Sequence, residues 1–397
     1  MEFYALCEQL TKNPLNGDLK LPVLKQTPYY INKPDNILPK GLTDSILRSS
    51  DPLEYHRTLK DYTVTPIIEL KELAQSFGVK NIFVKDESYR FGLNAFKGLG
   101  ASFAIFKILE KDPDIETFCS ATDGNHGRAV AWSAKLFGKK SKIFVPKDTT
   151  KARIQAIEKE GAVVEKVDAN YDETCEWAKK KSSENGWKLV QDTASGNYEE
   201  IPAYIMAGYL THFKELEDSL HTLPKPKIDI VFLQAGVGSW PAAAAWYYLN
   251  RYGKNKPKIV LVEPIEAAGI LASFKKGERT KPEGSFQTIM AGLNCGIPSL
   301  TAWEILKHSA DAAIAIEDSF TKQAIRQLYY PTNDDTRIIS GESGAGGLAG
   351  FIALMTGPQF RELKEALNIN AESKVLFYST EGDTDPENFK NIIQKKP

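Results

Sequence analysis

A single lysine, Lys97, lies in the stretch RFGLNAFKGLG (residues 90–100), among phenylalanine, leucine and glycine and at the expected start of a helix. Removal from water destabilises the charged form of an amine and lowers its pKa, as a lysine that attacks a carbonyl requires. A lysine can also pack its stem on apolar neighbours while its ammonium group reaches water. Taken alone, the stretch favours the ordinary packed lysine, so other residues must decide between the two interpretations.

A second candidate is SATDGNHG (residues 120–127), between an expected strand and an expected helix. Its two glycines permit a turn whose N–H groups point into one concavity, and the start of a helix adds positive partial charge. Such a turn can hold a carboxylate or a phosphate, although a tight turn with Asn125 as helix cap is an equally simple explanation. Asp123 does not suit an anion site, because its carboxylate would repel the anion.

Two further stretches follow predicted strands. QAGVGSW (residues 234–240) reads as a strand, a glycine turn and a helix, but Pro241 occupies the third glycine position of a dinucleotide fingerprint. One phosphate at the N-terminus of the helix therefore fits better than a pyrophosphate. STEGDTD (residues 379–385) could offer a hydroxyl to a neutral heteroaromatic nitrogen, or it could be a turn rich in aspartate.

Several other chemistries are not supported by the sequence. The five histidines are scattered without an HExxH pattern, and the four cysteines form no CxxC pair, so we expect no metal site. GESGA (residues 341–345) lacks the last glycine of the GxSxG nucleophile turn. A phosphate loop of the GxxxxGK[ST] type is also missing.

Composition limits the partners and the compartment. The 397 residues carry a formal net charge of −1, which argues against nucleic acid or an anionic membrane as a partner. No apolar run approaches the roughly 20 residues of a membrane helix, and the N-terminus does not resemble a signal peptide. Four widely separated cysteines suit a reducing compartment. We therefore expect a cytoplasmic protein whose ligand is a small molecule.

The pattern of elements predicts an α/β fold with central, mostly parallel sheets. Short apolar runs alternate with helix-length segments after a Pro- and Asn-rich region that extends to about residue 60 and is expected to be irregular. Continuous apolar runs are typical of strands buried on both faces of a parallel sheet. The strands are expected at residues 81–85, 117–121, 142–146, 162–167, 188–192, 229–234, 258–262, 312–316 and 374–379.

Two open α/β domains are expected. We predict a small domain at residues 115–215 and a large domain from residues 1–114 and 216–397, with the polar segment at residues 221–227 near the boundary. In such folds ligands bind at the carboxyl ends of the strands, in the crevice between domains.

In combination and in this order, the lysine, the Asn-containing turn, the glycine loop and the terminal hydroxyl resemble the fold type II pyridoxal-phosphate enzymes. Within that group the match to the diaminopropionate ammonia-lyases is closer, over residues 60–386. It rests on KDESYRFGLNAFK, TDGNHGRAVAW, QDTA…YEEIP, QAGVGS, MAGLNCG, GESGA and STEGDTD. One departure is Ser195-Gly196-Asn197 after QDTA, where the family has an aromatic residue, an acid and glycine.

The resemblance implies a role for each candidate. Lys97 would bind the aldehyde of pyridoxal 5'-phosphate covalently, Asn125 would bond its ring hydroxyl, and Thr380 would lie by its pyridine nitrogen. The backbone of Gly236, Val237, Gly238 and Ser239 would hold the phosphate. The substrate would contact Thr122, Asp123, Gly124, Asn125, His126 and Asp192. The family also implies a homodimer.

The implied reaction is α,β-elimination of D- or L-2,3-diaminopropionate to aminoacrylate, which hydrolyses to pyruvate, with release of two ammonia. Lys97 would remove the Cα proton of the L-isomer and Asp123 that of the D-isomer, while Asp192 would bind the distal ammonium. Two alternatives remain at this point. One is a related dehydratase or lyase acting on serine, threonine or 3-hydroxyaspartate, and the other is a non-enzymatic protein that binds the cofactor or an amino acid.

Overall fold

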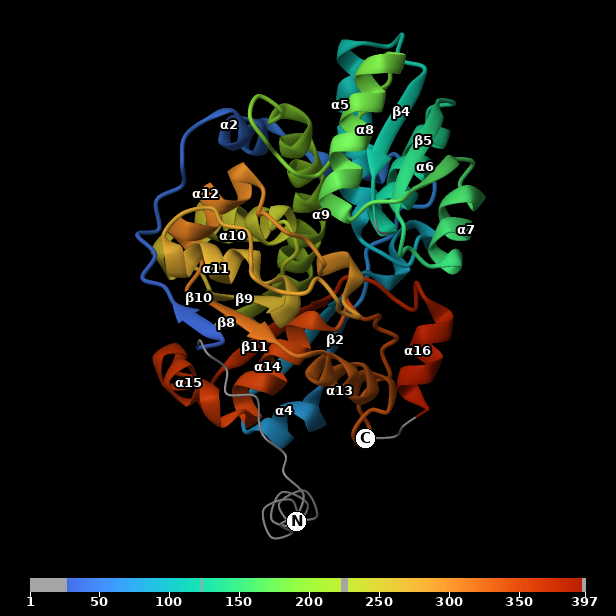
Figure 1. Ribbon diagram of the computed structural model, residues 1–397. Helices are drawn as coiled ribbons and strands as arrows, with labels where there is room; N and C mark the ends of the chain where they lie inside the picture. The colour runs from blue at the N-terminus through green and yellow to red at the C-terminus, as the bar shows by residue number, and fades with distance from the viewer. Residues whose placement is uncertain (1–26, 123, 223–227, 395–397) are drawn as a thin grey trace.

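Two β-sheets organise the computed structural model, which describes residues 27–122, 124–222 and 228–394. The larger sheet has seven strands in the order β1-β10-β9-β8-β11-β3-β2, and the smaller has four in the order β6-β5-β4-β7 (Figure 1). The strands are β1 (Tyr29–Ile31), β2 (Ile67–Glu69), β3 (Asn81–Asp86), β4 (Thr117–Ala121), β5 (Lys140–Pro146), β6 (Val163–Val167), β7 (Lys188–Leu189), β8 (Ile230–Gln234), β9 (Lys258–Pro264), β10 (Ala312–Ile316) and β11 (Lys374–Ser379).

Helices connect most of these strands. They are α2 (Leu42–Ser49), α3 (Pro52–Arg57), α4 (Lys71–Phe77), α5 (Lys97–Lys111), α6 (Asn125–Leu136), α7 (Lys151–Lys159), α8 (Tyr171–Asn185), α9 (Glu200–Thr222), α10 (Ser239–Tyr252), α11 (Gly269–Lys276), α12 (Leu300–Ser309), α13 (Asp318–Tyr329), α14 (Gly346–Thr356), α15 (Arg361–Leu367) and α16 (Pro386–Ile393). A short 3₁₀ segment, η1 (Glu87–Gly92), joins β3 to the stretch before α5. No helix in this described part combines the length and apolar character needed to span a bilayer.

The larger sheet is parallel except at its two edges, where β1 and β2 run antiparallel to their neighbours. Every residue of β8 and β10 is buried, as expected for strands covered on both faces. One face carries a core with α5, α9, α10 and α12, and the other carries a separate core with α4, α13, α14 and α15. The mostly parallel α/β fold predicted from the sequence is confirmed.

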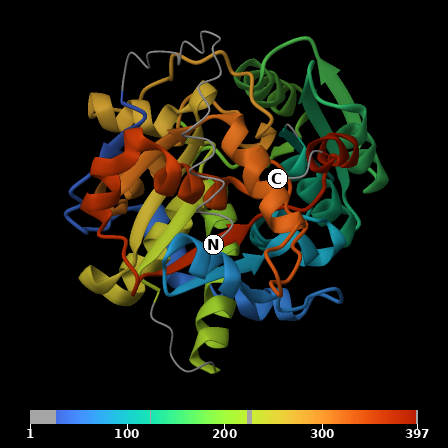
Figure 2. The ribbon, with the colours of Figure 1, turned by 90° about the horizontal axis from the view of Figure 1, so that it is seen from below.

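The smaller sheet is entirely parallel and lies with α6, α7 and α8 at the upper right of Figure 1. Figure 2 shows these elements, in teal and green, again at one side of the molecule. Long helix α9 follows β7 and packs on α5 and α10. The division into domains at residues 115–215 stays a prediction, and residues 223–227 of its expected boundary segment lie outside the described residues.

Two expectations about local structure are wrong. The region before residue 60 is not irregular throughout, since it contains β1, α2 and α3 (residues 1–26 lie outside the described part). A three-residue antiparallel edge strand such as β1 is too short to produce a readable periodicity. The strand expected at residues 188–192 ends at Leu189, and the chain then leaves the sheet toward Asp192.

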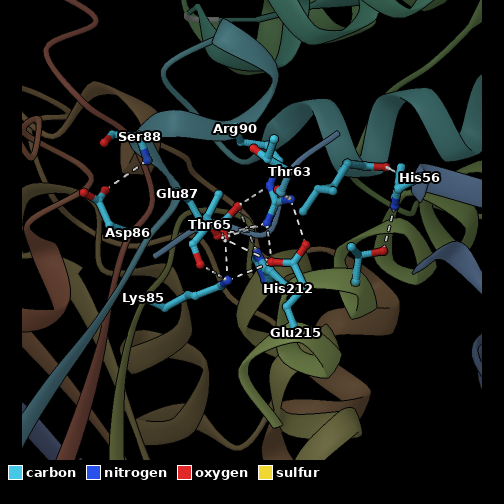
Figure 3. Close-up of polar contacts among 12 residues, drawn as sticks. His56, Thr63, Thr65, Lys85, Asp86, Glu87, Ser88, Arg90, His212 and Glu215 are labelled. Atoms are coloured by element: carbon cyan, nitrogen blue, oxygen red, sulfur yellow. Dashed lines mark hydrogen bonds and ion pairs between the residues drawn. The ribbon is translucent and has the colours of Figure 1, made fainter. Parts of the chain in front are cut away.

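A fully buried ionic cluster lies between β3, η1 and α9 (Figure 3). The Arg90 guanidinium donates to both carboxylate oxygens of Glu87, at 2.9 Å each, and to those of Glu215, at 2.8 and 2.7 Å. Lys85 Nζ donates to Glu215 at 2.7 Å and to the backbone oxygen of Thr65 at 2.8 Å. Two positive and two negative side chains thus compensate one another inside the molecule, and they tie η1 to α9.

The chain between this cluster and α5 makes an unusual turn. Phe91 and Asn94 have φ values of 52° and 53°, in the left-handed region that non-glycine residues rarely adopt. Hydrogen bonds hold the turn against the segment after β11, from Phe96 N to Thr380 O at 3.1 Å and from Gly382 N to Asn94 O at 2.8 Å. Two hydrogen bonds therefore fix the turn to this segment, and the turn ends at Lys97.

Candidate active site

Loops at the carboxyl ends of strands from both sheets meet around one pocket that opens to the solvent. In folds of this kind, ligands bind at this end of the strands. The pocket is lined by the predicted site residues Lys97, Thr122, Gly124, Asn125, His126, Asp192, Gly236, Val237, Gly238, Ser239 and Thr380. The structure therefore brings together the predicted site residues that it describes. Asp123 lies outside the described residues.

Lys97 is the first residue of α5, and its amine points at a carboxylate. Lys97 Nζ lies 2.7 Å from Asp192 Oδ2, and only 21% of the lysine side chain is exposed. The rings of Phe96 and Tyr209 lie 5.4 and 5.9 Å from the same nitrogen, measured to their centroids. The lysine is therefore enclosed by aromatic rings, as its sequence neighbours suggested, but it also has an ionic partner from a distant loop.

The expected lowering of the Lys97 pKa is wrong for the lysine as it is placed here. Burial would lower its pKa, but the Asp192 carboxylate outweighs burial and holds the pKa above the ordinary value. Burial would likewise raise the pKa of Asp192, but the ammonium of Lys97 outweighs burial and the pKa lies at about 2. The two groups form an ion pair, so Asp192 is fully ionised at neutral pH.

The turn at residues 122–126 presents polar groups to the pocket from the end of β4 and the start of α6. Thr122 Oγ1 accepts hydrogen bonds from the backbone N–H groups of Gly124 and Gly127, at 2.9 and 3.0 Å. A Cβ atom on Gly127 would lie 2.3 Å from the Thr122 side chain, so only glycine permits this close approach. Gly124, rather than Asn125, is the residue that precedes the helix, which leaves the Asn125 side chain available to the pocket.

His126 lies in the same turn and is buried. Its Nε2 lies 2.9 Å from the Val190 carbonyl oxygen, which can only accept, so Nε2 carries the proton. Burial lowers the pKa of His126 and favours the neutral ring. Nδ1 of that ring is then an acceptor, and it is buried without a hydrogen-bond partner among the described residues.

The loop after β8 has the features of an anion site. Gly238 precedes α10 with φ 92°, a conformation that favours glycine, and a Cβ atom on Gly236 would lie 3.1 Å from both Cys295 Sγ and Gly292 O. Among the described residues, the backbone N–H groups of residues 236–239 donate no hydrogen bond. Four free N–H groups at the start of a 14-residue helix can hold a phosphate. The Ser239 hydroxyl is engaged elsewhere, because it donates to the Asp192 carbonyl oxygen at 2.5 Å.

Glu381 and Gln234 are among the pocket residues that were not predicted individually from the sequence. Glu381 lines the pocket and accepts hydrogen bonds from the Asn125 side-chain amide and, at 2.8 Å, from Ser343 N. Gln234 also lines it and donates to Thr380 Oγ1 at 2.8 Å. Glu381 lies within the motif STEGDTD and Gln234 within QAGVGS, each close to residues that were predicted. That position in the motifs was the only sequence signal for them.

A family model described as pyridoxal-phosphate dependent enzyme matches residues 58–380. The diaminopropionate ammonia-lyase of Escherichia coli (strain K12) is 40% identical over 357 residues, which cover 86% of this chain and 89% of that protein. The enzyme of the same name from Salmonella typhimurium is 38% identical over 365 residues, covering 86% of this chain and 90% of that one. The chain therefore belongs to the pyridoxal-phosphate-dependent enzymes, in the group of the diaminopropionate ammonia-lyases.

Solved structures agree with this assignment. The E. coli diaminopropionate ammonia-lyase in complex with an aminoacrylate-PLP azomethine reaction intermediate superposes with a TM-score of 0.85 at 38% identity, covering 92% of this chain and 96% of that chain. A threonine deaminase from Solanum lycopersicum has a TM-score of 0.73 at 21% identity and shares the fold. The predicted family, fold type and cofactor are confirmed, and the chain is a lyase that uses pyridoxal 5'-phosphate.

Proposed function

We propose that the protein catalyses α,β-elimination of 2,3-diaminopropionate, as both the D- and L-isomer, to pyruvate and two molecules of ammonia. The observation that carries this proposal is the contact between Lys97 and Asp192 in a pocket that also holds a free N–H cradle. This substrate requires a base for its Cα proton and an acid that can bind its distal ammonium. Lys97 is protonated while it is paired with Asp192, so it would act as a base only after that pairing is broken.

In this proposal, each of the pocket residues contacts a different part of the cofactor. Lys97 would hold its aldehyde covalently in the absence of substrate, Asn125 would contact its ring hydroxyl, and Thr380 would contact its pyridine nitrogen. The N–H groups of residues 236–239 would hold its phosphate. When bound, the cofactor delocalises the electron pair that remains at Cα after the proton has left.

The protein's own groups would move the protons. Lys97 accepts the Cα proton of the L-isomer from one face, and Asp123 accepts that of the D-isomer from the other. The electron pair of the broken C–H bond forms the Cα–Cβ double bond, and the β-amino group leaves with a proton as ammonia. Water then hydrolyses the released aminoacrylate to pyruvate and the second ammonia.

Asp192 would select the substrate by binding its distal ammonium. The substrate's distal ammonium would take the place of the Lys97 ammonium on this carboxylate. Nδ1 of His126, which has no hydrogen-bond partner among the described residues, can accept a second hydrogen bond from the same ammonium. A hydroxyl in place of the ammonium, as in serine, would gain much less from the carboxylate, because charge-assisted hydrogen bonds are stronger.

Asp192→Asn is expected to raise KM for diaminopropionate about 10- to 100-fold, which corresponds to the loss of one charge-assisted hydrogen bond. KM for serine should change much less, since serine has no second cation. Steady-state kinetics with both substrates measures the difference. Asp168→Asn is the matched control, because the Asp168 side chain is 95% exposed and follows β6 in the same, smaller sheet. Equal increases in KM for both substrates would show that Asp192 positions the substrate without selecting for its distal ammonium.

The substrate itself is tested by pyruvate release from D- and L-diaminopropionate, measured beside D- and L-serine, threonine and 3-hydroxyaspartate. The proposal expects kcat/KM to be highest for diaminopropionate and measurable for both of its isomers. Higher kcat/KM for a hydroxy amino acid would instead make the protein a dehydratase. A protein that binds the cofactor but turns over none of these compounds would not be an enzyme of this class.

Further assignments complete the proposal. The protein would act in the cytoplasm as a homodimer, without nucleic acid or membrane as a partner. Its small domain would comprise residues 115–215, and its large domain residues 1–114 and 216–397. Light scattering of the holoenzyme tests the dimer, for which a monomeric mass is the contrary result.

A further inference from the structure

The side-chain amide of Gln234, at the end of β8, is buried, and its nitrogen lies within hydrogen-bond distance of three oxygen atoms. Its Nε2 lies 3.0 Å from Gly344 O, 2.9 Å from Tyr378 O and 2.8 Å from Thr380 Oγ1. The side chain reaches this position beneath α14, where a Cβ atom on Gly346 would lie 2.9 Å from Gln234 Cβ. Gln234 is only 3% exposed, so water does not replace it as the hydrogen-bond donor to these oxygens.

The two carbonyl groups determine which way the amide faces. A carbonyl oxygen only accepts hydrogen bonds, so the atom beside Gly344 O and Tyr378 O must be the NH₂ group and not the amide oxygen. The NH₂ group has two protons for these three oxygens, so at least one N–H is shared between two of them, and its nitrogen has no lone pair with which to accept from the Thr380 hydroxyl. The proton of the Thr380 hydroxyl must therefore point elsewhere, and Thr380 lines the pocket.

This orientation of the amide costs free energy, because it leaves the other polar atom of the amide without a hydrogen bond. With Nε2 turned to the three oxygens, Gln234 Oε1 is buried without a hydrogen-bond partner among the described residues. Unsatisfied buried acceptors are uncommon because they lose their hydrogen bonds to water. An amide that keeps one polar atom unsatisfied in order to donate with the other is consistent with a functional demand on its donor side.

We infer that Gln234 is a positioning residue that makes the Thr380 hydroxyl a hydrogen-bond donor, so that the group bound against Thr380 is an unprotonated heteroaromatic nitrogen. The inference rests on the proposed placement of Thr380 beside the pyridine nitrogen. A nitrogen that accepts this hydrogen bond carries no proton of its own, which keeps the ring a weaker electron sink. Gln234 would thus set the ionisation of the ring from a position that does not touch it.

The test is the ¹⁵N NMR signal of the pyridine nitrogen in holoenzyme loaded with ¹⁵N-labelled pyridoxal phosphate, recorded between pH 6 and 9. The wild-type nitrogen is expected to be unprotonated throughout. In Gln234→Met the two carbonyls lose their donor, and the Thr380 hydroxyl can donate to one of them and accept from the ring. The apparent pKa of the ring nitrogen should then rise by at least about one unit, a tenfold change in its ionisation equilibrium.

Thr380→Ala and the double variant separate this role from a merely structural one. Thr380→Ala should itself alter the nitrogen signal, and adding Gln234→Met should then produce no further change, because Gln234 acts only through the hydroxyl. A protonated nitrogen in the wild type would overturn the inference without any variant. An unchanged signal in Gln234→Met, with a changed one in Thr380→Ala, would overturn it while leaving the proposed function intact. An unchanged signal in Thr380→Ala would contradict the placement of Thr380 itself.

Discussion

Lys97→Ala is expected to lower kcat/KM for diaminopropionate by more than about 10³-fold and to remove the visible absorbance of the lysine-bound cofactor. The variant loses both the amine that bonds the aldehyde and the base that takes the Cα proton. The N–H cradle of residues 236–239 does not depend on this side chain, so the cofactor should still bind reversibly and be lost on dialysis. Absorbance spectra before and after dialysis, with a pyruvate assay, measure these effects.

Lys107→Ala provides the matched control for this experiment. Lys107 lies on the same helix, α5, and forms a partly exposed ion pair with Glu110 away from the pocket. Its replacement should leave both the absorbance and the turnover near wild-type values. If Lys97→Ala kept its absorbance band and its activity, another residue would carry the cofactor, and the site described here would be wrong.

Arg90→Met is expected to destabilise the protein by about 3–5 kcal/mol, the usual consequence of removing one partner from a buried ion pair. Methionine keeps much of the side-chain volume but leaves Glu87 and Glu215 with a single cation, Lys85, for two buried carboxylates. A lowered midpoint of urea denaturation would report the loss. The exposed ion pair of Arg361 with Glu365 offers the control, since Arg361→Met should shift the midpoint little.

The effect of Arg90→Met should depend on pH in a defined direction. Burial alone would raise the pKa values of Glu87 and Glu215, but the Arg90 guanidinium outweighs it and holds both below their ordinary values. Stability from such carboxylates is complete above the unfolded pKa, roughly 4.3, and is lost as the pH falls through the folded pKa. The gap between wild type and Arg90→Met should therefore narrow as the pH falls below roughly 4.3. A constant gap would show that Arg90 contributes through packing alone.

The sequence predicted the regular part of the fold well because its signals are local. Runs such as those of β8, β10 and β11 are continuously apolar, and that pattern requires burial on both faces whatever lies beside them. Edge strands β1 and β2 gave no such signal, since three residues in an antiparallel edge can have almost any composition. Their pairing is decided by the neighbouring strand, which the sequence around them does not reveal.

The site was predictable where a loop has to have a special backbone and was missed where side chains from distant loops meet. The glycines of residues 236–238 and 124–127 indicated turns, and turns at strand ends indicated the pocket. The pKa of Lys97 was predicted with the wrong sign because its partner, Asp192, lies 95 residues away and was assigned only to the substrate. Glu381 and Gln234 were missed because their contacts exist only in the folded protein. The contact of Glu381 with Asn125 joins the two sheets, and that of Gln234 with Thr380 requires β8 and β11 to be neighbours.

The proposed function depends on the amine of Lys97 as the residue that carries the cofactor, and this bond can be measured directly. Holoenzyme is reduced with borohydride to make the lysine–cofactor bond permanent, digested, and mapped by mass spectrometry. The added mass is expected on the peptide that contains Lys97 and on no other lysine. The added mass on a different lysine, or an unmodified Lys97 peptide from fully loaded enzyme, would contradict it.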